Sequence, residues 1–280
     1  MKVKILGSAA AECMPALWCE CATCKYARQH GGKDLRRRTS YLIDEDILVD
    51  LGPDFYWQTT AFAIDLSKIT RLFFTHSHLD HLAPVELRWR GEGFSQVAHL
   101  LHVYGDEAIF ERMFRELREA EHCPLTPVDL HLDIHPLQPG DMVKADDLEV
   151  LALPADHAPA EKPLLFLFRR GGKSLLIAND TGYFPEYAWT LLEGRKLDAV
   201  IIDCNGGTHP EYGYNRKGHS GAFTDEEIRK RLLGMGCLTQ SAPFVLNHFS
   251  HNAHCLHHEM AALMEPRGLQ VGFDGMEIEL

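Results

Sequence analysis

The sequence predicts an α/β fold in which two mixed sheets face each other and carry helices on their outer sides. Short apolar segments of strand character alternate with helical segments, but their spacing is too irregular for one parallel, doubly wound sheet. Four of the apolar segments end close to a residue of metal-ligand type, at His76, His157, Asp180 and His248. Because open sheets bind ligands at the carboxyl edge of their strands, these residues indicate a common site.

The composition is that of one large domain with an acidic surface. The chain has 280 residues, 45% of them hydrophobic, and we predict a single domain over residues 1–280 because no linker, internal repeat or low-complexity stretch divides it. Its 28 basic and 40 acidic residues give a net charge of −12. That charge disfavours nucleic acid as the main partner, whereas an anionic substrate stays compatible because bound divalent cations would reverse the local field.

Features of the N-terminus and of the cysteines predict a cytoplasmic protein with no membrane partner. Residues 1–5 begin directly in a strand-like alternation rather than in a signal peptide. No apolar run approaches the roughly 18 residues that span a membrane. In such a compartment the eight cysteines are expected to be reduced thiols or metal ligands rather than a disulfide framework.

The first predicted strand, residues 3–6, leads into a cysteine-rich loop at about residues 13–30. Cys19, Cys21 and Cys24 lie within six residues and could supply three thiolates to one tetrahedral zinc ion, with a fourth ligand from elsewhere in the chain. A disulfide or three unused thiols is the alternative. Zinc is favoured because this polar segment has little apolar content with which to hold its own shape.

Three arginines, residues 36–38, precede a strand at residues 39–43. We favour a solvated strand entry for this basic run over a phosphate contact by Arg38, Thr39 or Ser40. A second strand follows at residues 47–51 and closes on a turn containing Gly52-Pro53. The next segment, residues 54–64, is predicted to be a helix whose aromatic side chains pack in the core.

The densest chemical signal is the stretch Thr75–Leu82, which contains His76, His78, Asp80 and His81. It follows the apolar run at residues 72–74, so it reads as the loop after a buried strand, continuing into a helix near Pro84. Imidazoles and a carboxylate are poor core material without partners but good ligands for zinc, iron or manganese. A coincidental polar loop is the alternative, and the rarity of this spacing disfavours it.

The middle of the chain alternates strands with one long helix. Residues 101–104 are predicted to be a strand, and residues 106–121 an amphipathic helix with its apolar residues on one side. Strand 148–153 ends before His157, and the hairpin of residues 164–168 and 174–178 ends before Asp180. Five histidines without mutual ligand spacing are interpreted as ordinary surface or core residues: His99, His102, His122, His131 and His135.

The last third contains a buried strand at residues 197–202 and then a long, polar, glycine-rich loop at residues 206–221. Long loops of this kind are usually functional or disordered, and this one carries His209 and His219. A capping box at residues 224–227 predicts a helix to about residue 234. Strand 243–246 ends at His248, a helix follows at residues 254–264, and the chain is expected to close with a strand pair around residues 273–277.

The HxHxDH motif at residues 76–81, with the later single residues His157, Asp180 and His248, resembles the metallo-β-lactamase superfamily. The resemblance implies a four-layer αββα sandwich over essentially the whole chain, with two divalent catalytic metals. It assigns His76, His78 and His157 to one metal, assigns Asp80, His81 and His248 to the other, and makes Asp180 the bridge between them.

Three further features narrow the resemblance to the PhnP family, the phosphoribosyl cyclic phosphodiesterases of phosphonate breakdown. They are the CxCxxC cluster, the segment Asn247-His248-Phe249-Ser250-His251 and the terminal segment at residues 272–278. This narrower resemblance implies a structural zinc held by Cys19, Cys21, Cys24 and His251, and it implies a homodimer to which the cysteine segment contributes.

The activity that follows is hydrolysis of a small cyclic phosphate ester at two ions, manganese or zinc. The ions lower the pKa of a shared water, and they stabilise the charge that develops on phosphorus. Asp80 acts mainly as a metal ligand in this scheme. The leaving alkoxide needs a proton, for which His219 is the candidate donor and His209 its competitor.

Other activities of the same superfamily remain as alternatives. A tRNA 3′-processing endonuclease should carry a basic or glycine- and proline-rich arm for RNA, which this acidic chain lacks. A carbonyl hydrolase would use the same metals, and a non-catalytic metal-binding role in cofactor biosynthesis is the third alternative. A flavodiiron redox role is disfavoured because His78 stands where that family has a glutamate.

Overall fold

The computed structural model describes residues 1–121 and 124–280 and contains two large mixed sheets. His122 therefore lies outside the described residues. Within them, each sheet has seven strands. In spatial order the first sheet consists of β14 (Glu277–Glu279), β1 (Lys2–Gly7), β2 (Ser40–Ile43), β3 (Ile47–Val49), β4 (Arg71–Phe73), β5 (Leu101–Gly105) and β6 (Leu132–Pro136).

The second sheet is formed by the later part of the chain. Its order is β13 (Gln270–Val271), β12 (Phe244–Asn247), β11 (Ala199–Asp203), β10 (Lys173–Ala178), β9 (Leu164–Arg170), β8 (Leu148–Pro154) and β7 (Met142–Ala145). Strands β10 to β13 run parallel to one another, and β7 to β10 are antiparallel neighbours. This mixture confirms the prediction of mixed sheets.

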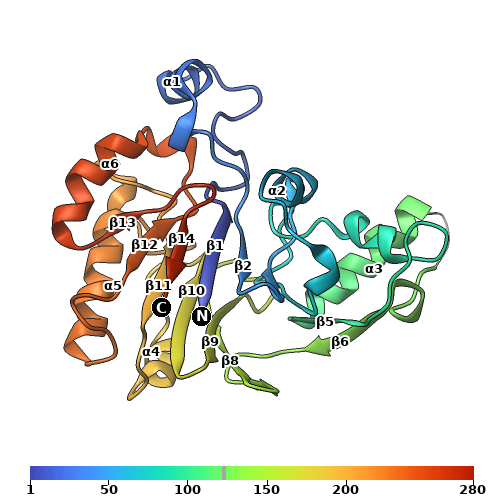
Figure 1. Cartoon of the computed structure of the whole chain (residues 1–280). Coiled ribbons are helices and arrows are strands. Elements are labelled where there is room, and N and C mark those ends of the chain that lie inside the picture. The colour runs from blue at the N-terminus through green and yellow to red at the C-terminus, as the bar shows by residue number, and fades with distance from the viewer. Residues whose placement is uncertain (122–123) are drawn as a thin grey trace.

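The helices other than α1 lie on the two outer faces (Figure 1). The α-helices are α1 (Ala22–His30), α2 (Phe55–Ala61), α3 (Glu107–Glu121), α4 (Glu186–Leu192), α5 (Ala222–Gly234) and α6 (His257–Met264). Helices α2 and α3 cover the first sheet, and α4 to α6 cover the second. Helix α1 instead projects beyond the sheets, and the predicted loop at residues 13–30 therefore contains a helix.

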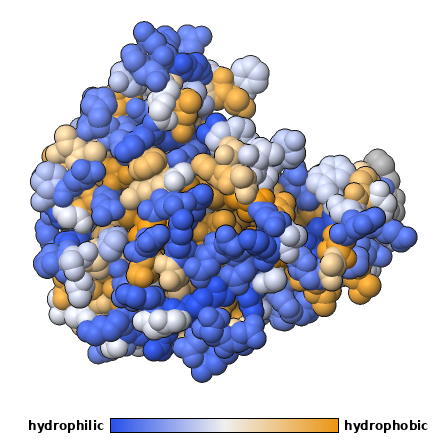
Figure 2. Space-filling view, viewed as in Figure 1, coloured by the Kyte–Doolittle hydropathy of each residue, from blue (hydrophilic) through white to orange (hydrophobic). Residues whose placement is uncertain are grey.

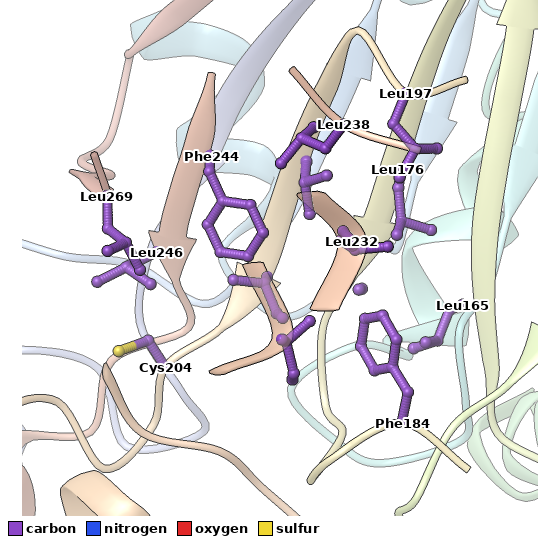
Figure 3. Close-up of a cluster of buried hydrophobic side chains, with 14 of the residues drawn as sticks. Leu165, Leu176, Phe184, Leu197, Cys204, Leu232, Leu238, Phe244, Leu246 and Leu269 are labelled. Carbon is purple, nitrogen blue, oxygen red and sulfur yellow. The ribbon is translucent and has the colours of Figure 1, made fainter. Parts of the chain in front are cut away.

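Alternation along the strands produces three apolar layers. In β10, Leu175 and Ile177 point into the core between the sheets, whereas Leu176 points to the outer layer under the helices. Figure 3 shows that outer layer, where Leu232 of α5 lies among Leu176 and Phe244 of the sheet. A third cluster joins the first sheet to α2 and α3. The predicted αββα sandwich is therefore confirmed.

Two details at the C-terminal end of the chain differ from expectation. Helix α5 begins at Ala222, so Thr224 lies inside the helix and makes no side-chain cap. The predicted capping box is therefore wrong. The predicted terminal strand pair is also wrong, because β13 adds to the second sheet and β14 pairs with β1 in the first. Sequence pattern identifies strands, but pairing depends on which sheet edge is open.

Candidate metal centre

The four strand ends named in the sequence converge at one edge of the sandwich. His76 and His81 follow β4, His157 follows β8, Asp180 follows β10 and His248 follows β12. Strand β4 belongs to the first sheet, whereas β8, β10 and β12 belong to the second. The centre is therefore built across the seam between the two sheets.

Three imidazoles form the first group of candidate ligands. One ring nitrogen from each of His76, His78 and His157 lies within 4.8 Å of the others. His157 Nε2 is 3.1 Å from His78 Nδ1. The other nitrogen of His157, Nδ1, donates to the carbonyl oxygen of Gly218 at 2.7 Å, which leaves Nε2 free to act as a ligand.

The second group combines imidazoles with carboxylates and is buried. Asp80, His81, Asp180 and His248 offer ligand atoms within 4.8 Å of one another. Oxygen Oδ2 of Asp180 is 3.1 Å from His81 Nε2, and Oδ1 is 3.1 Å from His248 Nε2. Oδ1 is also 3.9 Å from Nε2 of both His76 and His157. Asp180 thus lies between the two groups.

Backbone strain accompanies this convergence. Asp180 and His248 have φ angles of 51° and 60°, in the left-handed region that non-glycine residues rarely occupy. Asp50, which follows β3, shares this conformation with a φ of 60°. Each residue comes just after a strand, where the left-handed turn redirects the side chain into the site. Such strain is characteristic of functional positions held by surrounding structure.

Buried partners hold the ligand-type rings in place. Nδ1 of His81 is 2.7 Å from Oδ2 of Asp50, whose carboxylate also accepts hydrogen bonds from the backbone and hydroxyl of Thr75. The Nδ1 atom of His248 lies 3.0 Å from the Thr39 hydroxyl, which donates to Ala9 O. Thr39 therefore orients a histidine, whereas the sequence suggested only a solvated strand or a phosphate contact.

Burial and the neighbouring charged groups together shift the pKa values of the candidate ligands. Burial lowers the pKa of His76 and of His157, so both favour the neutral form that binds metals. Burial works against ionisation of Asp180, but His248 and His81 outweigh it and hold its pKa well below the usual range. Burial also opposes protonation of His81, yet Asp180, Asp80 and Asp50 raise its pKa well above the usual value. A cation bound there would compete with this proton.

The long glycine-rich loop brings His219 to the same place. Nδ1 of His219 donates to Oδ2 of Asp203 at 2.7 Å and is 4.0 Å from Asp180 Oδ1. Two backbone amides, those of Thr181 and Asn205, donate to the Asp203 carboxylate. Burial works against protonation of His219, but Asp203 outweighs it and raises the pKa to about 9.

A cavity of about 610 Å³ opens beside these groups. His209 lies on its wall, stacked on Tyr212 with a centroid distance of 4.4 Å. His209 Nδ1 accepts hydrogen bonds from the backbone amides of Glu211 and Tyr212, so that nitrogen carries no proton. The wall also includes His254, which falls in the helix predicted at residues 254–264 but lies before the start of α6.

The cysteine cluster forms a separate centre in the projecting segment. Sulfur atoms of Cys19 and Cys21 lie 3.5 and 3.8 Å from Nδ1 of His251, and Cys24 completes a group whose ligand atoms are within 4.8 Å. The backbone amide of Cys21 donates to the Cys19 sulfur, that of Cys24 to the Cys21 sulfur and that of Ala16 to the Cys24 sulfur. Donation to sulfur in this manner stabilises thiolates.

Sequence reasoning missed three positioning residues. Asp50, Thr39 and Asp203 are fully buried, and each holds a histidine of the site. Asp203 stands directly after the predicted strand at residues 197–202, and Asp50 stands near the end of the predicted strand at residues 47–51; no other signal was available for them. Which histidine each would contact depends on the packing of the two sheets, and the sequence contains no information on that.

The fold and this centre define a class: an αββα sandwich with two adjoining groups of metal-ligand type side chains at the strand ends. The family described as "Beta-lactamase superfamily domain" matches residues 45–249. The chain therefore belongs to the metallo-β-lactamase superfamily, and it resembles the PhnP family within it. None of the helices in the described parts of the chain is long and apolar enough to cross a membrane.

Among curated proteins, the chain is 27% identical over 298 aligned positions to an octanoyltransferase of Porphyromonas gingivalis. That alignment covers 99% of this chain and 51% of the octanoyltransferase. It is 29% identical over 114 positions to ribonuclease Z of Methanothermobacter thermautotrophicus, covering 41% of this chain and 36% of the relative. The chain thus spans about half the length of the octanoyltransferase and about a third of the length of the ribonuclease Z. Coenzyme PQQ synthesis protein B of Klebsiella pneumoniae is 28% identical over 316 positions, covering 100% of this chain and 98% of that protein.

Solved structures share the fold over the full chain. A diphosphatase from the PhnP family superposes with a TM-score of 0.73 at 23% identity, covering 100% of this chain and 96% of the other. Zinc-bound PqqB from Methylobacterium extorquens gives a TM-score of 0.69 at 18% identity, with complete coverage of both chains. These similarities establish the fold, and the chemistry has to be argued from the site.

Proposed function

We propose that the protein is a metal-dependent hydrolase of small phosphodiesters, with a cyclic phosphate of the phosphoribosyl type as its substrate. One observation carries this proposal: two ligand groups joined by Asp180 lie beside His219, whose Nδ1 donates to the Asp203 carboxylate. The first group supports binding of one divalent ion by His76, His78 and His157. The second supports binding of another ion by Asp80, His81 and His248, with Asp180 shared between the two.

Unpaired buried atoms support the fit of these groups to metal ions. His76 Nε2 is a buried side-chain atom without a hydrogen-bond partner, and His81 Nε2 and Asp180 Oδ2 face each other at 3.1 Å without forming a hydrogen bond of normal geometry. Leaving such atoms unpaired costs free energy, and a cation among them would remove that cost. Imidazole and carboxylate together suit both manganese and zinc, so the donor set alone does not select the metal.

The chemistry divides between bound ions and this chain's own groups. Two divalent ions bound in such a site lower the pKa of a water to near neutrality and stabilise negative charge on phosphate oxygens. Asp180, Asp80 and the buried histidines would hold the two ions. His219 supplies the proton that the leaving alkoxide takes up. Asp203 keeps Nδ1 of that ring occupied, so the proton leaves from Nε2.

His219 fits the role of acid better than His209. The Asp203 carboxylate favours the protonated form of His219. His209 instead uses Nδ1 to accept two backbone hydrogen bonds and has no carboxylate partner of this kind among its hydrogen bonds in the described residues. Its stacking on Tyr212 suits a wall that contacts the substrate.

The cavity wall favours a small, hydroxyl-rich substrate over RNA. No lysine or arginine lines this cavity among the described residues, and its carboxylates include Glu12 and Asp80. Uncharged polar groups are contributed instead by Asn205, Asn215, Ser250, Asn252 and Tyr212. Amide and hydroxyl groups pair well with sugar hydroxyls, whereas RNA binding depends on neutralising phosphates with lysine or arginine. The volume of about 610 Å³ is within the range for small-molecule sites.

We also propose a structural zinc ion at Cys19, Cys21, Cys24 and His251. The amide donors to the three sulfurs and the proximity of His251 support a closed tetrahedral site of the Cys₃His type. His251 comes three residues after His248, so one short segment would serve both centres.

The homodimer remains a prediction, with this projecting segment as its contact. Leu17 and Trp18 are 76% and 95% exposed there. Figure 2 shows some hydrophobic residues among the mostly hydrophilic ones on the surface of the same projection. Sedimentation of the purified protein would test it, and a single monomeric species would contradict it.

The test is a comparison of substrates. Manganese- or zinc-loaded protein is offered a ribose 1,2-cyclic phosphate, a linear dinucleotide, a pre-tRNA and an ester panel. We expect turnover of the cyclic phosphate well above the other compounds. Preferential cleavage of pre-tRNA or of esters would replace the proposal with one of the superfamily's other activities.

A leaving-group comparison tests the acid. We expect His219→Asn to slow hydrolysis of the cyclic phosphate by about 10²–10⁴-fold and to slow that of bis-p-nitrophenyl phosphate much less, because p-nitrophenolate leaves without a proton. His209→Asn should show no such difference between the substrates. The reverse pattern would make His209 the acid.

A second candidate is a binding role without turnover. It is favoured by the full-length match to Coenzyme PQQ synthesis protein B. Under that alternative the loaded protein binds two ions at the strand ends but hydrolyses none of these compounds.

A further inference from the structure

We propose a binding site for one divalent transition-metal ion at His102, Asp133 and His135, on the inner face of the first sheet near its edge. His102 and His135 have no mutual ligand spacing in the sequence, which predicts ordinary surface or core residues. The structure places them together, and the cluster lies outside both centres described above.

Strand register creates this site. Strands β5 and β6 are parallel neighbours in which His102 lies opposite Asp133 and Tyr104 lies opposite His135. Asp133 and His135 are two residues apart on β6 and therefore share a face. All three ligand candidates thus come from regular strands, whose backbone positions are more rigid than those of a loop.

The distances match the coordination of a metal. His102 Nδ1 is 3.0 Å from Asp133 Oδ2 and 3.2 Å from His135 Nε2, and His135 Nε2 is 3.1 Å from Asp133 Oδ2. With bonds of about 2.1 Å, ligands at right angles are about 3.0 Å apart and tetrahedral ligands about 3.4 Å apart. The triangle fits one face of an octahedron, with the other positions left for water.

Neighbouring aromatic rings hold one ligand in position. The His135 ring stacks on Tyr104 with a centroid distance of 4.6 Å, and Tyr104 stacks on Phe73 at 4.5 Å. The buried end of this stack, Phe73, belongs to the core between the sheets. The site is nonetheless accessible, because the side chains of His102, Asp133 and His135 are 39%, 45% and 36% exposed.

The nearest cation on the adjoining strand does not prevent metal binding. Arg71 of β4 lies opposite His102 but is engaged in ion pairs with Asp46 at 3.1 Å and Asp146 at 2.7 Å. Two imidazoles and one carboxylate favour zinc, nickel, cobalt or copper over magnesium and calcium, which prefer oxygen ligands. A hydrogen-bonded cluster in which Asp133 accepts from both rings is the competing explanation.

Counting bound nickel tests the proposal. Wild-type protein, His102→Gln/His135→Gln and His131→Asn are dialysed against Ni²⁺, and bound metal is measured by mass spectrometry. His131 is an exposed neighbouring histidine with a φ of 52°, which asparagine tolerates, so it is the matched control. We expect the double variant to bind one nickel ion fewer per chain than the other two proteins. Equal numbers in all three would overturn the proposal.

A second measurement needs no variant to fold. Wild-type protein labelled with ¹⁵N in its histidines is first loaded with zinc until the cysteine and strand-end centres are saturated. Further Zn²⁺ should then shift the ring nitrogen signals of two more histidines, one through Nδ1 and one through Nε2. If no further imidazole responds, Asp133 only accepts hydrogen bonds, and the proposal fails.

Discussion

The strand-end centre and the cysteine centre both bring metal-ligand type side chains together, but they do so in different ways. The first collects ligand-type side chains from His76 to His248, placed by strands of both sheets, and opens on a cavity. The second takes three cysteines from one short segment, adds His251 and offers four ligand atoms that would surround an ion completely. An open site leaves room for substrate, whereas a closed site contributes only to folding. Loss of the first should therefore affect catalysis, and loss of the second should affect stability.

The largest expected effect separates the two centres directly. Loss of a residue that only positions a metal ligand typically lowers metal affinity or activity by about 10–100-fold. Asp80→Ala removes a ligand itself, so it should reduce phosphodiester hydrolysis by a larger factor. We expect one ion fewer at the strand-end centre and an unchanged zinc ion at the cysteine centre, measured by metal analysis and by hydrolysis of bis-p-nitrophenyl phosphate. The control is Glu12→Gln, which removes a carboxylate from the cavity wall but not from either ligand group. Undiminished turnover with all ions bound would defeat the two-metal proposal.

The converse variant acts on the cysteine centre. Cys24→Ser should release the structural zinc and lower the free energy of unfolding by more than about 3 kcal/mol, above the ordinary range for single substitutions. Turnover should fall far less than in Asp80→Ala. Zinc content and chemical denaturation measure the effect, with Cys237→Ser as a control at a buried thiol outside both ligand groups. Equal stability of the two serine variants would show that Cys24 holds no zinc.

A third prediction sharpens the comparison by leaving every ligand in place. Thr39→Val keeps the shape of the side chain but removes the hydroxyl next to His248 Nδ1. We expect metal affinity at the strand-end centre to fall by about 10–100-fold, as measured by competition with a chelator. Thr39→Ser retains the hydroxyl and should bind nearly as tightly as wild type. If valine and serine behave alike, the Thr39 hydroxyl does not orient the histidine.

The smallest expected effect is a shift in pH dependence. Asp203 raises the pKa of His219 against the effect of burial, so Asp203→Asn should lower that pKa. Because the acid must be protonated, activity is lost as pH rises through its pKa, and the basic limb of the kcat profile should move to lower pH. Bound dications would lower the wild-type pKa towards neutrality but would not reverse this difference. A basic limb at the same pH in both proteins would mean that another group supplies the proton.

The cluster of His102, Asp133 and His135 is a third candidate metal site, and it differs from the other two in how its ligands are placed. Its ligands are separated in sequence like those of the strand-end centre, yet they lie within two neighbouring strands rather than past strand ends. Sequence reasoning identified residues where a polar side chain interrupts the end of an apolar strand. It had no comparable signal for polar residues on the face of a strand near the sheet edge, where polar residues are ordinary.

Local patterns were sufficient for much of this protein. Alternation and apolar runs predicted the hairpin of β9 and β10 and the helix α3 almost to their ends, because side-chain periodicity follows from backbone geometry alone. The HxHxDH motif and the CxCxxC cluster marked both candidate metal centres, because a local run of ligands is rare without chemical use. The αββα class also followed from the sequence through these motifs.

Only the tertiary structure decided which distant residues meet. The pairing of β13 and β14 with different sheets, the contact of Thr39 with His248 and that of Asp203 with His219 all depend on sheet order and on the packing of one sheet on the other. A sequence specifies such contacts through the summed free energy of the whole core rather than through any local pattern. The candidate ligand residues could therefore be identified from the sequence, whereas the residues that contact them were determined only by the folded structure.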